Sequence, residues 1–217
     1  MKKRVVMILI VACLLAGSVF AAQGSFKVGG HVGWGFDWRA SKQQLFGGNI
    51  IKKTTSNGFN FAIDGEYEFI DGFSAKVEVG AMTMGKLSTY SKSNEGEETV
   101  VADKATPMNF NFYVGGKYEA PINEQFGAFC GLGFDVMLGK QSADEDEKVN
   151  TRIGLGIEAG GLYYLNDSLS INLGARYSVY LINTSQDVKD EISYLKDHNG
   201  SLFQHGLKIF AGASYSL

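Results

Sequence analysis

Residues 24–38 read GSFKVGGHVGWGFDW, and apolar and polar positions alternate along this stretch. Every second residue from Phe26 to Trp38 is apolar or glycine, whereas Lys27, His31 and Asp37 fall between them. Side chains of a β-strand point to opposite faces with a period of two. The stretch therefore predicts a strand with one apolar face and one polar face.

Seven later stretches repeat this alternation, and the segments between them alternate in length. The predicted strands are 25–38, 58–69, 73–84, 107–119, 126–139, 151–164, 168–182 and 205–217. The connections 39–57, 85–106, 140–150 and 183–204 are long, whereas 70–72, 120–125 and 165–167 are short. Long extracellular loops and short periplasmic turns are typical of outer-membrane barrels. The sequence predicts an all-β fold, an eight-stranded antiparallel up-and-down transmembrane barrel.

A soluble barrel or sandwich with its apolar faces inward would show the same alternation. Two observations favour the membrane. The strands, at about 12 residues, are longer than is usual in soluble sheets and suit a tilted span. Aromatic residues also gather near the strand ends, where rings favour the membrane interface. The predicted aromatic girdles are Phe26, Phe69, Tyr118, Phe126, Tyr163 and Tyr215 at the short-turn rim, and Trp34 and Trp38 at the other.

The first 21 residues have the pattern of a secretory signal peptide. Lys2, Lys3 and Arg4 precede an apolar run, and small residues lead to Ala21. We expect cleavage after residue 21, which leaves 22–217 as a single barrel domain with Cys130 as its one cysteine. The alternatives are an uncleaved anchor, or lipidation at Cys13 after a very short apolar run.

The polar strand faces predict a charged barrel interior. An eight-stranded barrel is just wide enough to be filled by side chains, and charges buried there must be paired. The alternation also places five further titratable side chains on the inward faces of their strands: Lys27, His31, Asp37, Glu68 and Arg152. The inward glycines predict room for water, so a narrow porin-like channel for small solutes is the alternative function. The predicted lumen charge network is Asp64, Glu66, Lys76, Glu78, Lys117, Glu119, Asp135, Glu158, Arg176 and Lys208.

Catalytic and metal-binding patterns are weak. Acyl transfer needs a serine with a histidine base, and no His-x-Ser pair occurs around His31, His198 or His205. Acidic runs at 95–98 and 144–147 do not have the spacing of a calcium loop. We predict no enzyme activity, no cofactor, no metal site and no nucleic-acid partner.

Several segments carry a resemblance to a known superfamily: GSFKVGGHVGWGFDW, the strand end GGKYE at 115–119, GLGFDV at 131–136, GLGIEAGGLYYL at 154–165 and the closing LKIFAGASYSL. The chain resembles the small eight-stranded outer-membrane barrels of the outer membrane protein X and Ail type, the opacity proteins and the barrel half of outer membrane protein A. Such barrels usually end on an aromatic residue, whereas this chain ends on Leu217, with Tyr215 two residues earlier.

The resemblance implies a non-enzymatic protein of the cell outer membrane with a membrane-structural or adhesin-like role. Its implied partners are outer-membrane lipids and lipopolysaccharide, the barrel assembly machinery, and an extracellular ligand bound through the loops. The implied oligomeric state is a monomer.

Overall fold

The computed structural model describes residues 24–45, 48–92, 98–105, 108–139, 150–184, 193 and 201–217. The predicted signal peptide and most of the connections 140–150 and 183–204 lie outside these ranges. Within the described ranges, no helix is both long and apolar enough to cross a membrane. The strands are β1 Ser25–Leu45, β2 Gly48–Ile70, β3 Phe73–Lys92, β4 Glu98–Ala105, β5 Asn109–Pro121, β6 Phe126–Gly139, β7 Asn150–Tyr164, β8 Leu169–Asn183 and β9 Ser201–Ser216.

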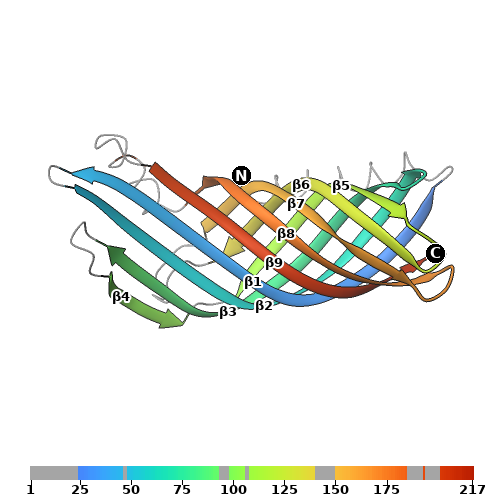
Figure 1. Ribbon diagram of the computed structural model, residues 1–217, viewed down its shortest axis with the longest axis horizontal. Coiled ribbons are helices and arrows are strands. Elements are labelled where there is room, and N and C mark those ends of the chain that lie inside the picture. The colour runs from blue at the N-terminus through green and yellow to red at the C-terminus, as the bar shows by residue number, and fades with distance from the viewer. Residues whose placement is uncertain are drawn as a thin grey trace, which may run out of the picture.

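These strands form one closed antiparallel sheet (Figure 1). β1 pairs with both β2 and β9, and β2 also pairs with β3, which closes the ring. β4 pairs with β3 alone, so eight strands make the barrel. The predicted eight-stranded antiparallel barrel is therefore confirmed.

The strand register shows how strongly the strands are tilted. A walk along paired residues from Phe36 through every strand returns to β1 at Phe26, ten residues nearer the N-terminus. Such a stagger requires strands inclined by roughly 35–45° to the barrel axis. With eight strands, this geometry leaves an interior that side chains can fill.

The predicted loops 39–57 and 85–106 are wrong over most of their length. β1 continues to Leu45 and β2 begins at Gly48, while β3 continues to Lys92 and β4 pairs back onto it. Figure 1 shows these strands projecting well beyond the rest of the barrel. Beyond the apolar belt, neither face of a strand has to be apolar. These extensions therefore lack the alternation of apolar and polar residues that marks the strands within the belt. β-branched residues such as Ile50, Ile51 and Val100 are the remaining strand signal.

Tight turns join the strands at the opposite end. In the β5–β6 turn, the Asn123 side chain accepts hydrogen bonds from the backbone N–H groups of Gln125 and Phe126, at 2.9 and 2.8 Å. Asn166 makes the same pair of bonds in the β7–β8 turn. Gly72 has a φ of 75°, the left-handed conformation that glycine adopts without strain.

Burial is inverted relative to a soluble protein. Large apolar side chains cover the outside, and Ile63 and Leu173 are 71% and 65% exposed. Charged side chains are buried inside, and Arg176 is only 1% exposed. Because a soluble barrel would bury its apolar face, this distribution excludes the soluble alternative.

Candidate functional site: the charged barrel interior

Arg176 on β8 is the centre of the interior charge cluster. Its guanidinium donates two hydrogen bonds to Glu78 on β3, Nη1–Oε1 at 2.8 Å and Nη2–Oε2 at 2.5 Å. It also donates from Nε to Glu158 Oε2 on the neighbouring β7, at 3.1 Å. β5, β6 and β7 separate β3 from β8 in the sheet. The Arg176–Glu78 pair therefore bridges the lumen from wall to wall.

Two further side chains complete this cluster. Lys76 Nζ lies 3.2 Å from Glu158 Oε1 and 3.7 Å from Glu78 Oε2. The ring of Tyr113 lies under the guanidinium, with 3.7 Å from the ring centroid to Arg176 Cζ. Two cations thus face two carboxylates, and an aromatic ring closes one side of the arginine.

A second group of ion pairs continues toward the short-turn rim. Lys117 Nζ lies 2.8 Å from Glu66 Oε1 and 2.7 Å from Glu119 Oε1. Lys27 Nζ lies 2.6 Å from Glu119 Oε2 and 3.6 Å from Glu68 Oε2. Lys76 and Glu66, 3.9 Å apart, join this group to the Arg176 cluster. The ion pairs form one continuous chain from Lys27 to Arg176.

The interior toward the long-connection end carries fewer charges. Arg152 on β7 pairs with Asp37 on β1, packs over the Tyr180 ring at 5.0 Å and contacts Met137. Asp135 accepts a hydrogen bond from Ser178 Oγ at 2.5 Å. Lys208 Nζ lies 3.7 Å from Asp135 Oδ2.

Asp64 and His31 adjoin the central cluster. His31 Nδ1 lies 3.6 Å from Asp64 Oδ1, and His31 Nε2 lies 3.7 Å from Glu78 Oε1. The imidazole also packs on Phe210, with ring centroids 4.7 Å apart. All ten residues proposed for the network thus lie on the inner wall. Asp135 and Lys208 are outside the continuous chain of ion pairs and form a separate pair.

Large side chains occupy the space above the inward glycines. A β-carbon at Gly133 would lie 2.8 Å from Tyr113 Cζ, and one at Gly174 would lie 2.7 Å from Phe129 Cζ. The expected room for water at these glycines is therefore wrong, because aromatic rings lie across the barrel there. The prediction from charged residues overlooked Phe129, Phe210 and Met82, although the same alternation places them inside. These apolar side chains fill the lumen between the ion pairs.

Buried polar atoms without a hydrogen bond to any described residue gather at the long-connection half. The full set is His31 Nε2, Asp37 Oδ1, Asn60 Oδ1, Asn109 Oδ1, Tyr113 Oη, Asp135 Oδ1, Asn172 Oδ1, Tyr180 Oη and Lys208 Nζ. Asp37, Asn60, Asn109, Asp135 and Tyr180 lie nearer the long-connection end of their strands than the Arg176–Glu78 bridge does. Such groups need water or another polar ligand.

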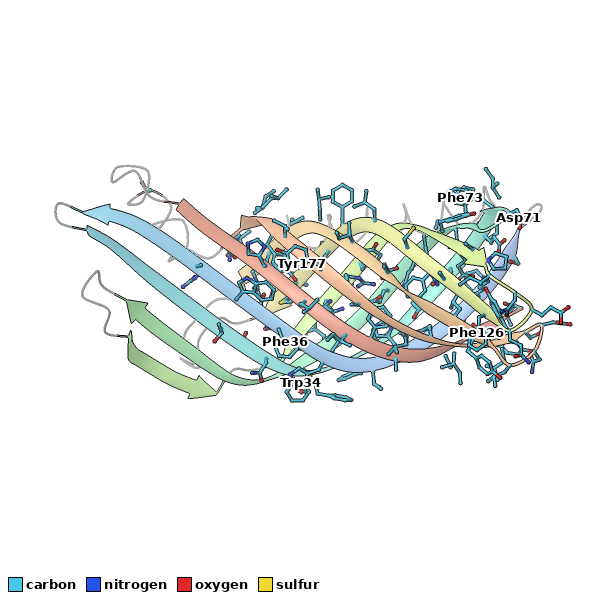
Figure 2. The ribbon with its side chains drawn as sticks, viewed as in Figure 1. Trp34, Phe36, Asp71, Phe73, Phe126 and Tyr177 are labelled. Atoms are coloured by element: carbon cyan, nitrogen blue, oxygen red, sulfur yellow. The ribbon has the colours of Figure 1, made fainter. Side chains whose placement is uncertain are left out.

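The outward aromatic residues fall in two groups. In Figure 2, Phe73 and Phe126 lie near the short-turn end of the barrel. Nearer the middle lie Trp34, Phe36 and Tyr177. Near the turns, Phe73 packs on Tyr118 and Phe126 on Tyr163, at centroid distances of 4.5 and 5.2 Å. Of the eight proposed girdle residues, Trp38 is the half-buried exception. The seven exposed ones are Phe26, Trp34, Phe69, Tyr118, Phe126, Tyr163 and Tyr215.

Comparison with known proteins identifies the family. The family model described as outer membrane protein beta-barrel domain matches residues 9–202. Neisserial surface protein A superposes with a TM-score of 0.54 at 13% identity, covering 89% of this chain and 99% of that protein. Outer membrane protein OprG from Pseudomonas aeruginosa gives 0.50 at 16% identity, covering 89% and 96%. No curated protein sequence matches the chain.

Proposed function

The chain belongs to the family of outer membrane protein β-barrel domains and resides in the outer membrane, and on that premise we propose a non-enzymatic surface protein. Its barrel has a membrane-structural role, and its projecting strands interact with partners outside the cell in an adhesin-like manner. The Arg176–Glu78 bridge across the lumen is the observation that carries this proposal. A barrel closed at its centre by paired charges and aromatic rings is a rigid support rather than an open pore.

The projecting strands supply the surface for interaction. β9, β1, β2, β3 and β4 stay paired past the ring, and within the described residues β4 is paired on one side only. An extended segment of a partner can add to such an edge through main-chain hydrogen bonds. The long connections of barrels in this class face the cell exterior, which is where we place these strands.

The alternative function is a narrow porin-like channel for small solutes. The unpartnered polar atoms of the long-connection half favour it, since they require water inside the barrel. In that case the Arg176 cluster would be the barrier to passage.

Planar-bilayer conductance of the refolded protein separates the two functions. We expect no steady openings, because the central charges are paired across the lumen. Steady openings, together with a change in ion selectivity in an Arg176→Ala variant, would establish the channel instead.

Orientation and the edge strand need their own test. Epitope tags inserted near Gly96 and Ser185 should be accessible to antibody on intact cells, whereas a tag near Asn123 should not.

A Val100→Pro substitution removes a backbone donor from β4 and should reduce adhesion of expressing cells to epithelial monolayers. Unchanged adhesion would contradict the role of the β4 edge.

A further inference from the structure

The pairing between β8 and β9 stops before either strand ends. Within the described residues, the last ladder pair is Val179 with His205, although residues 180–183 of β8 and 201–204 of β9 lie beyond it. On their other sides both strands stay paired to their ends, β8 with β7 and β9 with β1. Figure 1 shows β9 continuing past the end of β8. We call the stretch where 180–183 and 201–204 face each other without a ladder the seam.

A side-chain hydrogen bond joins the two strands across the seam. Asn183 Nδ2 donates to Gln204 Oε1 at 2.9 Å, and both side chains are buried. The seam begins directly beyond Trp38, which is the register partner of His205. Because tryptophan rings favour the membrane interface, the seam lies on the water side of the apolar belt. At this place, which water can reach, side chains instead of a backbone ladder hold the barrel wall together.

The inner wall beside the seam leaves room above Gly206. A β-carbon at Gly206 would lie 3.3 Å from Tyr180 Oη and 3.7 Å from Asp37 Oδ1. These distances leave space for a water oxygen, whose hydrogen bonds are about 2.8 Å long. Tyr180 Oη makes no more than a weak contact with Ser178, and Asp37 Oδ1 has no hydrogen bond to a described residue. Two buried polar atoms that need a partner therefore border this position, which we call the recess.

Side chains fill the axis of the barrel at the level of the recess. Asp37 is the register partner of Gly206, and its ion pair with Arg152 joins β1 to β7. Met82 on β3 also reaches β1, where a β-carbon at Gly35 would lie 2.1 Å from the Met82 sulfur. A molecule that enters along the barrel axis must displace these side chains. A molecule that enters through the seam reaches the recess without crossing them.

We propose that the seam is a side port through which water and small uncharged polar solutes enter the long-connection half of the lumen, with the Asn183–Gln204 hydrogen bond as its latch. The recess takes uncharged molecules, because Asp37 and Arg152 pair with each other and leave no net charge to hold an ion. The path ends at the Arg176–Glu78 bridge, so the port opens into the upper lumen and not through the membrane. The port is separate from the proposed surface role, and a silent bilayer conductance would leave it intact.

Hydrogen peroxide is a small uncharged polar probe of entry, because it converts methionine thioethers to sulfoxides. Met137 packs with Met82 and Tyr180 inside the barrel and is 2% exposed, whereas the outward Met108 is 47% exposed. The refolded protein in phosphatidylcholine vesicles is treated with peroxide, and mass spectrometry follows the sulfoxide at each methionine. Peroxide crosses bilayers, so the orientation of the barrel in the vesicle does not affect the result.

An Asn183→Cys, Gln204→Cys disulfide locks the seam, in a Cys130→Ala background that removes the native thiol. The lock should slow oxidation of Met137 at least about fivefold relative to Cys130→Ala alone, because local opening of the seam is then prevented. Oxidation of Met108 should stay unchanged. Asn183→Ala removes the latch instead, and should speed oxidation of Met137 by about two- to tenfold, as expected for one lost hydrogen bond.

The matched control is a Leu138→Cys, Thr151→Cys disulfide in the same background. It joins two register partners of β6 and β7, where the ladder is continuous, and should leave oxidation of Met137 unchanged. Heat-shifted electrophoretic migration confirms that each variant has folded. Equal slowing by both disulfides, or no slowing by the seam disulfide, overturns the side port. If the seam disulfide does not close, Asn183→Ala decides, and an unchanged oxidation rate of Met137 in that variant overturns the port as well.

Discussion

The two halves of the barrel interior differ in how completely their buried charged and polar groups are paired. In the short-turn half, Lys27, Lys117 and Lys76 each contact at least two carboxylates, in a chain of ion pairs that ends at Arg176. In the long-connection half, Arg152 and Asp37 form a single pair, and most unpartnered polar atoms lie there. In the short-turn half, where each charge has several partners, removing one side chain should leave several buried charges unpaired. In the long-connection half, where some polar groups already lack partners, removing one charged side chain should reduce the free energy of unfolding by less.

Arg176→Ala should cause the largest loss of stability. It removes one of the two cations that pair with Glu78 and Glu158 and leaves only Lys76 beside these buried carboxylates, and breaking a buried pair typically costs about 3–5 kcal/mol. Urea unfolding of the refolded protein in detergent measures the change. An unfolding free energy equal to that of the wild type would show that water screens these charges, and would remove the proposed difference between the two halves.

The outward face gives a second test, because lipid surrounds both halves but at different depths. Leu155→Arg near the middle of β7 should cost about 2–4 kcal/mol, whereas Leu181→Arg near the end of β8 should cost about 0–1 kcal/mol. Both leucines are exposed in the structure, so lost packing is small in either variant. Unfolding in lipid vesicles measures both values. Equal costs at the two positions would mean that the apolar belt extends evenly past Leu181.

The fold was largely predictable because lipid and lumen enforce opposite polarity on alternate residues. Val28 and Glu66 each follow the rule for their face, and the same rule places Arg176 and Glu78 inside. The register between strands is what the alternation cannot supply. It decides that Arg176 meets Glu78 across the barrel while Lys208 stands 3.7 Å from Asp135. The strand extensions 39–45, 48–57 and 85–92 could not be predicted in this way, because beyond the apolar belt no lipid requires alternate residues to differ in polarity.

Arg152→Ala should cost less than Arg176→Ala. Within the described residues Arg152 forms an ion pair with one carboxylate, that of Asp37, whose other oxygen already lacks a hydrogen bond. Removing the arginine leaves one carboxylate unpaired in the half of the lumen where we expect water, at an expected cost of about 1–3 kcal/mol. The same urea titration compares both arginine variants directly. A cost that matches or exceeds that of Arg176→Ala would show that the long-connection half is as dry as the other.

Tyr180→Phe should have the smallest effect and gives the finest test of the comparison. The Tyr180 hydroxyl is buried and makes no more than a weak contact with the Ser178 side chain, so its removal deletes a polar group and breaks little within the protein. If water does not reach the hydroxyl, the variant should be unchanged or more stable by up to about 1 kcal/mol, because the desolvation penalty disappears. If an ordered water binds there, the loss of its hydrogen bonds should cost about 0.5–1.5 kcal/mol. Asn109 and Asp37 leave unpartnered oxygens in the same half of the lumen. We therefore expect the second result, a small loss in urea unfolding, and a stabilised variant would mean that this half of the lumen is dry.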